Sequence, residues 1–101
     1  MADEPKTKGG PVKLQIQLDE DIAQGAYVNL AMVNHSETEF IIDFIYVQPQ
    51  QPRAKVRARI ISSPKHTKRL LNALQDNIAK FEQRFGTIEA GAPPFVGDIV
   101  H

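Results

Sequence analysis

The sequence predicts an α+β domain in which a four-stranded antiparallel meander is followed by one long C-terminal helix. Three observations lead to this fold class. Four stretches between positions 12 and 62 are typical of strands: apolar and polar residues alternate in the first and fourth, and the second and third are largely apolar. The period then changes to that of a helix. The connections between the strands are short and polar, which is typical of hairpins.

The first strand is predicted from Val12 to Leu18, where the apolar residues Val12, Leu14, Ile16 and Leu18 alternate with polar ones. Residues 1–11 contain two Pro and two Gly and are expected to form a flexible N-terminal arm. The stretch DEDIAQG then predicts a turn region that ends at Gly25.

The second strand is predicted within AYVNLAMV, residues 26–33, and the third within EFIIDFIYV, residues 39–47. The third is rich in aromatic and β-branched residues, which favour strands. The polar turn NHSET lies between them, and QPQQPR breaks the sheet after the third strand. The fourth strand, AKVRARIIS, alternates again and predicts an outward row of Lys55, Arg57 and Arg59.

A helix is predicted from Ser63 to Phe85. Ser63 and Pro64 form an N-cap and first-turn pair, and Gly86 suits the left-handed residue that ends many helices. Its apolar residues are spaced by three or four: Leu71, Leu74, Ile78, Phe81 and Phe85. One domain is expected over residues 12–86, with an irregular tail over 87–101.

Both faces of the predicted sheet are apolar, although one helix can cover only one of them. Leaving such side chains in water would forfeit roughly 1.5–3 kcal/mol each. The sequence therefore predicts self-association as a dimer or a dimer of dimers. The expected oligomer interface is the second face, formed by Tyr27, Val33, Ile41, Ile45 and Val47.

The charges are segregated along the chain. The chain has twelve basic and twelve acidic residues, yet the 19 residues from Arg53 to Leu71 include seven Lys or Arg and no acid. Between Leu14 and Pro52 there are six acids and no Lys or Arg. Two interpretations compete: the acids of one segment face the bases of the next, within a subunit or across a dimer, or the bases form one cationic surface for a partner. The candidate partner-binding residues are Arg53, Lys55, Arg57, Arg59, Lys65, Lys68 and Arg69.

Catalysis is not expected. The sequence shows no paired-carboxylate, nucleophile–base or metal-ligand spacing and no phosphate-binding glycine pattern, so no cofactor or metal is predicted. His35 is interpreted as a turn residue, and His66 as a residue of the first helical turn. Asp43 is the one carboxylate within an apolar strand and should have a partner; a cross-strand pair with a base such as Arg57 is the simplest interpretation.

The segment from 15 to 86 resembles a family of small bacterial proteins known only as a domain of unknown function. The residues that carry the resemblance are AxGxYxNLAxVxHSxxEFxxDFxxxxP and AKVxxRIIxSPxHxKRLLxALxxNIxxFE. The resemblance implies a bacterial, cytoplasmic protein and no assigned activity. A meander followed by one long helix is also similar in order to the export chaperone SecB, a likeness of architecture alone.

These observations predict a cytoplasmic, non-catalytic protein-interaction module, adaptor or chaperone-like, that acts as a homo-oligomer. The chain has no Cys, no apolar signal sequence and no apolar run long enough to span a membrane. The alternative is a dimeric nucleic-acid-binding protein that uses the basic strand and helix start on phosphates. The neutral charge balance and the lack of an aromatic stacking platform count against that alternative.

Overall fold

The computed structural model describes residues 11–51 and 53–92 and confirms an α+β fold. A short helix α1 (Glu20–Ala23) precedes three strands, β1 (Leu30–His35), β2 (Phe40–Val47) and β3 (Ala54–Ser62), and the long helix α2 (Pro64–Phe85) follows. The strands form one antiparallel sheet in the order β1-β2-β3, so that β2 is the central strand. No described helix has both the length and the apolar character needed to cross a membrane.

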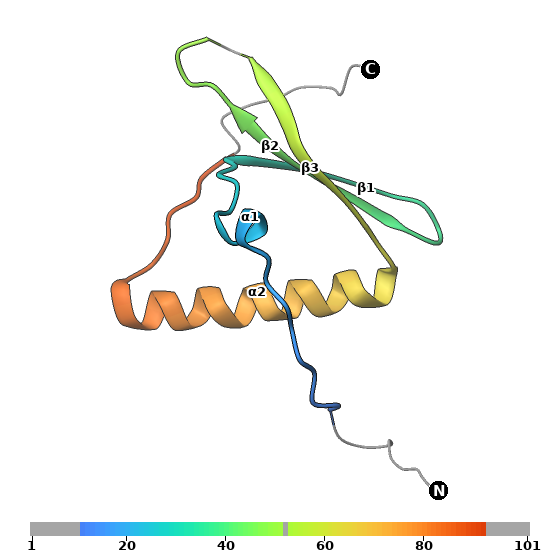
Figure 1. Ribbon diagram of the computed structural model, residues 1–101. Helices are drawn as coiled ribbons and strands as arrows, with labels where there is room; N and C mark the ends of the chain where they lie inside the picture. The colour runs from blue at the N-terminus through green and yellow to red at the C-terminus, as the bar shows by residue number, and fades with distance from the viewer. Residues whose placement is uncertain (1–10, 52, 93–101) are drawn as a thin grey trace, which may run out of the picture.

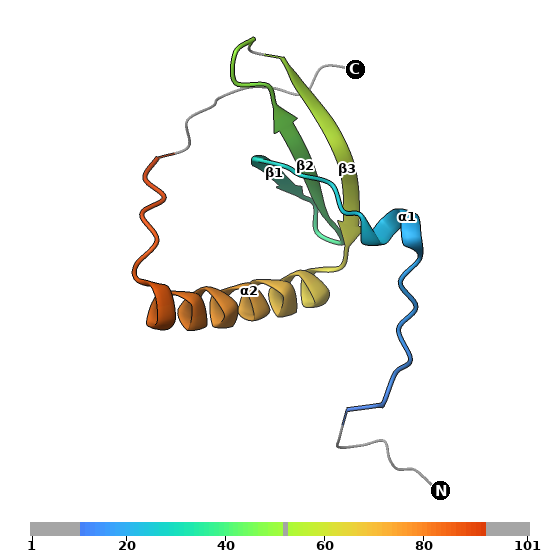
Figure 2. The ribbon, with the colours of Figure 1, turned by 60° about the vertical axis from the view of Figure 1, so that its left-hand side comes forward.

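The prediction of a fourth strand within the protomer is wrong. Residues Val12–Leu18 have no regular secondary structure and pair with no strand in the described part of the chain. Figures 1 and 2 show the segment running from α1 away from the sheet. Alternation shows that a segment is suited to a sheet, but it does not say which strand edge the segment will join. The predicted flexible arm, residues 1–11, lies outside the described residues except for Pro11.

The β1–β2 hairpin is closed by the turn that the polar NHSET stretch predicts. The Ser36 amide donates to the Glu39 carbonyl at 2.9 Å, and the Ser36 Oγ accepts from the amides of Thr38 and Glu39. The last pair of the ladder is His35 with Phe40, whose rings stack with centroids 5.2 Å apart. β1 begins at Leu30, four residues later than the predicted second strand, because residues 26–29 precede the first pair of the ladder.

The side chain of Asn29 extends the ladder past the start of β1. Its amide oxygen accepts from the Val47 N–H at 2.8 Å, and its amide nitrogen donates to the Val47 carbonyl at 3.0 Å. The Asn29 backbone N–H donates to the Ile45 carbonyl. One residue therefore satisfies both backbone groups of Val47 where a strand would otherwise be needed.

The β2–β3 pairing contains a β-bulge at Arg57. Phe44 pairs with Ala58, but Ile45 pairs with Val56, so Arg57 is the extra residue of β3 and has no cross-strand partner in the register. Bulges of this kind bend and twist the strand that carries them. They also break the strict alternation on which a face assignment from sequence depends.

The protomer buries few side chains. Among the described residues, the buried apolar side chains are Ile42, Ile45 and Val47, all on the central strand β2, and Asp43 is buried beside them. The residues of β1 and β3 are half-buried or exposed. The sheet thus has a narrow core along β2, and most apolar surface elsewhere is uncovered.

Helix α2 has the predicted caps. The Ser63 Oγ accepts from the His66 amide at 3.2 Å, Pro64 takes the first turn, and Gly86 has a φ of 102° and donates its N–H to the Glu82 carbonyl. The helix passes beneath the sheet as a separate layer (Figures 1 and 2), and none of its residues is buried. Residues 87–92 have no regular secondary structure, and the Ile88 amide donates to the Glu82 carboxylate. The rest of the predicted irregular tail, residues 93–101, lies outside the described residues.

Candidate interaction surface

Asp43 is fully buried and forms a two-point ion pair with Arg59 on the neighbouring strand. The Arg59 Nε donates to Oδ1 at 2.7 Å and a terminal guanidinium nitrogen donates to Oδ2 at 3.0 Å. Hydrogen bonding to Arg59 holds the pKa of Asp43 below its ordinary value, against the opposite effect of desolvation. The same pair raises the pKa of Arg59. Asp43 therefore has the cross-strand partner that its position requires, and its role here is structural.

The partner is Arg59 rather than Arg57, and the bulge gives the reason. The register places Asp43 directly opposite Arg59, whereas Arg57 is the extra residue of the bulge. Because of the same bulge, the predicted outward row of Lys55, Arg57 and Arg59 does not lie on one face of the sheet. Lys55 pairs with Tyr46 and Arg59 pairs with Asp43, and Tyr46 and Asp43 point to opposite faces of β2. Lys55 and Arg59 therefore lie on different faces of the sheet.

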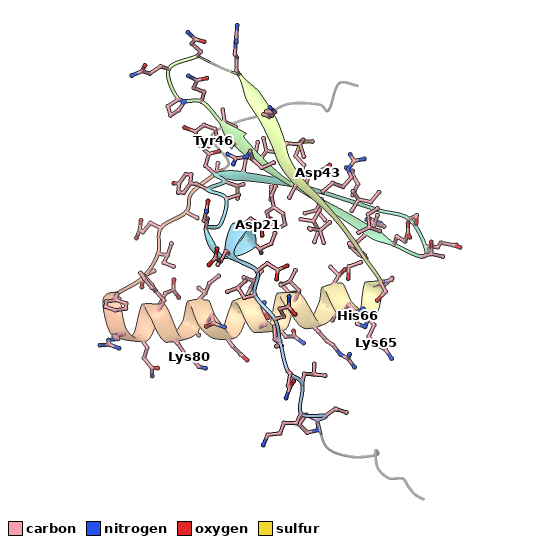
Figure 3. All side chains as sticks on the ribbon, viewed as in Figure 1. Asp21, Asp43, Tyr46, Lys65, His66 and Lys80 are labelled. Carbon is pink, nitrogen blue, oxygen red and sulfur yellow. The ribbon has the colours of Figure 1, made fainter. Side chains whose placement is uncertain are left out.

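The predicted cationic residues do not form one patch. Arg53 and Lys55 lie at the start of β3, next to the β2–β3 hairpin, whereas Lys65 and His66 lie at the start of α2 (Figure 3). Lys55 lies near the start of β3, so most of this nine-residue strand, on the order of 20 Å at the rise of a β-strand, separates the two groups. Two separate exposed groups result: Arg53, Lys55 and Arg57 near the hairpin, and Lys65, Lys68 and Arg69 in the first two turns of α2.

The five predicted interface residues are divided between the two faces. Ile41, Ile45 and Val47 share the Asp43 face, but the register pairs Val33 with Ile42 on the other face. The ring of Tyr27 makes an edge contact with Tyr46, at a centroid distance of 6.3 Å, on the same side as Val33. Ile45 and Val47 are each only 4% exposed within the protomer. Little apolar area is left on these two residues for a second molecule to cover.

A continuous exposed apolar stripe lies on α2 instead. Its stripe is formed by residues that repeat every three or four positions and are between 45% and 66% exposed: Leu71, Leu74, Ile78, Phe81 and Phe85. The rings of Phe81 and Phe85 are in contact, with centroids 5.0 Å apart, and Leu70 is exposed beside the stripe. A helix with an apolar stripe of this width normally packs against a core. No such packing occurs within the described protomer.

A second apolar surface lies on the segment Val12–Leu18, which we call the N-terminal segment. Its four apolar side chains are between 66% and 86% exposed. Its polar residues alternate with them, so the segment has the pattern of a half-buried strand without the neighbours that would bury it. The acidic residues Asp19, Glu20 and Asp21 follow directly.

His66 lies in the first turn of α2, as expected, but His35 is the last residue of β1 and not the turn residue that was predicted. His35 stacks on Phe40 at the end of the hairpin, and His66 donates its backbone amide to the N-cap. Within the residues that the structure describes, no group of three or more His, Asp or Glu side chains is placed to hold a metal ion.

The residues of the α2 stripe were identified from the sequence by their spacing. Their spacing of three, four, three and four residues also fits the seam of a helix that pairs with another molecule. The exposed N-terminal segment was likewise predicted as a strand, and its alternation was the correct signal for a surface that requires burial.

Comparison with protein families shows the family of the chain. It belongs to the family described as protein of unknown function (DUF3467), whose model matches residues 1–90. This match confirms the resemblance to a domain of unknown function that the central motifs indicate. No curated protein and no solved structure matched the chain.

Proposed function

We propose that this protein is a non-catalytic protein-interaction module, adaptor or chaperone-like, that acts as a homo-oligomer. The observation that carries the proposal is the apolar stripe of α2, which is about half exposed along the whole helix. A cytoplasmic location, as the sequence suggests, would suit such a module.

The energetics of α2 support self-association. A 22-residue helix without tertiary contacts is only marginally stable in water, and packing of an amphipathic face supplies most helical stability in proteins. Covering the exposed half of each stripe residue would contribute on the order of 1 kcal/mol. Five such residues in each of two copies are enough to favour association of two chains over separate protomers.

The proposal extends to the sheet. The predicted fourth strand would form only in the oligomer, when another copy supplies a strand edge for the N-terminal segment. This accounts for an alternating, exposed segment in a chain whose own sheet has three strands.

Light scattering in solution tests the proposal most directly. The wild-type chain has a mass of 11.3 kDa, and we expect a measured mass of two or four chains. Ile78→Asp places a charge in the stripe and should shift the mass towards a single chain. Asn72→Asp adds the same charge on the opposite side of α2 and should leave the oligomer intact. A single-chain mass for the wild type would contradict the proposal.

The alternative function is nucleic-acid binding by the exposed cations Arg53, Lys55 and Arg57 at the hairpin end of β3. The engagement of Arg59 by Asp43, and the distance to the basic start of α2, both reduce the cationic surface that phosphates would meet. Fluorescence anisotropy with single- and double-stranded DNA and RNA separates the two functions. Nucleic-acid binding predicts an affinity that falls steeply with salt and is weakened by Lys55→Glu. The interaction module predicts no such binding.

A further inference from the structure

We infer that the N-terminal segment of one copy pairs with β3 of a second copy as an antiparallel fourth strand, and that two copies exchange these strands reciprocally. The inference rests on the self-association proposed above and adds the residues that make the contact. Three features of the described chain support it: a strand-like segment without neighbours, a strand edge without a neighbour, and a charge match between the two.

The segment and the edge fit one another in length and in pattern. The N-terminal segment and Asp19 together make eight residues, and β3 has nine. β3 is the outer strand of the sheet, so along its outer side the described chain offers it no backbone partner. Its apolar side chains Val56, Ile60 and Ile61 are between 39% and 57% exposed. An added strand would satisfy the backbone groups of both strands and cover apolar residues on each.

Charge selects β3 rather than β1, the other outer strand. The N-terminal segment leads directly into Asp19, Glu20 and Asp21. β3 begins beside Arg53 and carries Lys55 and Arg57 at the same end, whereas β1, with the sequence LAMVNH, has no Lys or Arg. Only pairing with β3 therefore brings the acidic cluster beside bases of its own strand partner.

Charge also selects the antiparallel direction. In that direction the Val12 end lies beside Ser62, and Asp19 comes to the end of β3 that carries Lys55. In the parallel direction Lys13 would lie beside Lys55, and two like charges directly opposite one another are unfavourable. Antiparallel pairing is also slightly more stable for each residue.

The path of the chain favours exchange between copies over folding back. From α1 the N-terminal segment runs past the level of α2 and away from its own sheet in both views (Figures 1 and 2). Exchange would also explain how a chain with segregated acids and bases can balance its charge, because the acidic turn of one copy would face the basic strand of the other.

Disulfide trapping tests the inference. Because the chain has no native Cys, only the introduced Cys residues can form a disulfide. Two differently tagged chains are co-expressed, one with Lys13→Cys and the other with Ile61→Cys, which lie opposite one another in the antiparallel alignment. After mild oxidation we expect a covalent heterodimer at about tenfold the yield of the control pair, Lys13→Cys with Lys55→Cys, which is too far apart to bridge. The native mass of each sample is measured by light scattering.

Each other outcome overturns the inference in a distinct way. A cross-link in the control pair alone would mean that the strands run parallel. A chain carrying both Lys13→Cys and Ile61→Cys that closes an internal disulfide and gives no covalent dimer would place the strand on its own sheet. An oligomeric mass without any cross-link would refute strand exchange and leave the proposed function standing. A single-chain mass would refute both.

Discussion

The central strand and the long helix satisfy their side chains in opposite ways. β2 buries Ile42, Ile45 and Val47 and pairs its one carboxylate, Asp43, with two hydrogen bonds from Arg59. α2 has 22 residues against 8 in β2, is capped at both ends, and buries none of its residues. The side chains of β2 are therefore buried and paired within the protomer, whereas α2 has regular secondary structure but no tertiary packing partner in the protomer. The predictions below test this division.

The largest effect is expected when the ion pair in the sheet is broken. Asp43→Ala removes both acceptors and leaves Arg59 without its partner next to a small core, so the melting temperature should fall by about 10 °C or more. Thermal unfolding followed by circular dichroism measures this. Glu37→Ala, a change of an exposed acid in the hairpin turn, is the control and should have little effect. An equal change for both variants would contradict the structural role of Asp43.

The next effect concerns how each region responds to dilution. If α2 is stable only in the oligomer, its amide hydrogens should exchange about tenfold or more faster once dilution separates the copies. The amides of β2 should change much less, because their hydrogen bonds lie within the protomer. Hydrogen exchange measured at several protein concentrations separates the two regions. If the exchange protection of the α2 amides does not depend on protein concentration, the proposed difference between α2 and β2 is wrong.

The N-cap of α2 gives a smaller effect. Ser63→Ala removes the acceptor for the His66 amide and should destabilise the protein by about 1 kcal/mol. Ser63→Asp keeps an acceptor and adds a negative charge at the helix start, beside Lys65, so it should be neutral or stabilising. Urea unfolding of the three proteins measures the difference. Equal losses of stability in Ser63→Asp and Ser63→Ala would contradict the N-cap role of Ser63.

The smallest effect is a pH dependence confined to acid. Because Arg59 holds the pKa of Asp43 below its ordinary value of 3.8, the pair stabilises the folded state above that pH. The contribution is lost as the pH falls below 3.8 through the lowered pKa, and it is constant at neutral pH. Acid titration of stability should therefore show a loss in wild type that is reduced in Asp43→Asn. A pH dependence of this pair near neutrality would contradict the assignment.

The sequence predicted those elements whose signals are local. Ser63, Pro64 and Gly86 mark the ends of α2, and the aromatic and β-branched run marks β2, so both were located within a residue or two. The strand register and the absence of a partner for the N-terminal segment, which both depend on other strands, were not predicted. Alternation could not show that the N-terminal segment lacks a partner in the protomer, because the pattern specifies a half-buried surface and not the surface that covers it.

The candidate site shows the same limit in finer detail. A partner for Asp43 could be predicted, because a buried carboxylate needs one. Its identity could not, because the choice between Arg57 and Arg59 depends on a bulge that no local pattern announces. Tyr27 and Val33 were predicted on the same face as Ile41 but lie on the other face, because the face of a residue depends on how its strand pairs with the next one.

The bulge also indicates where the family can vary in length. Arg57 is an additional residue to which the register assigns no counterpart, while every pair on either side of it is complete. A chain shorter by this one residue would keep all of the pairs in the β2–β3 ladder and lose a bend and a cation. Relatives with a single-residue deletion are therefore expected at this point of β3, and a deletion elsewhere in the strand would instead turn the remaining side chains over.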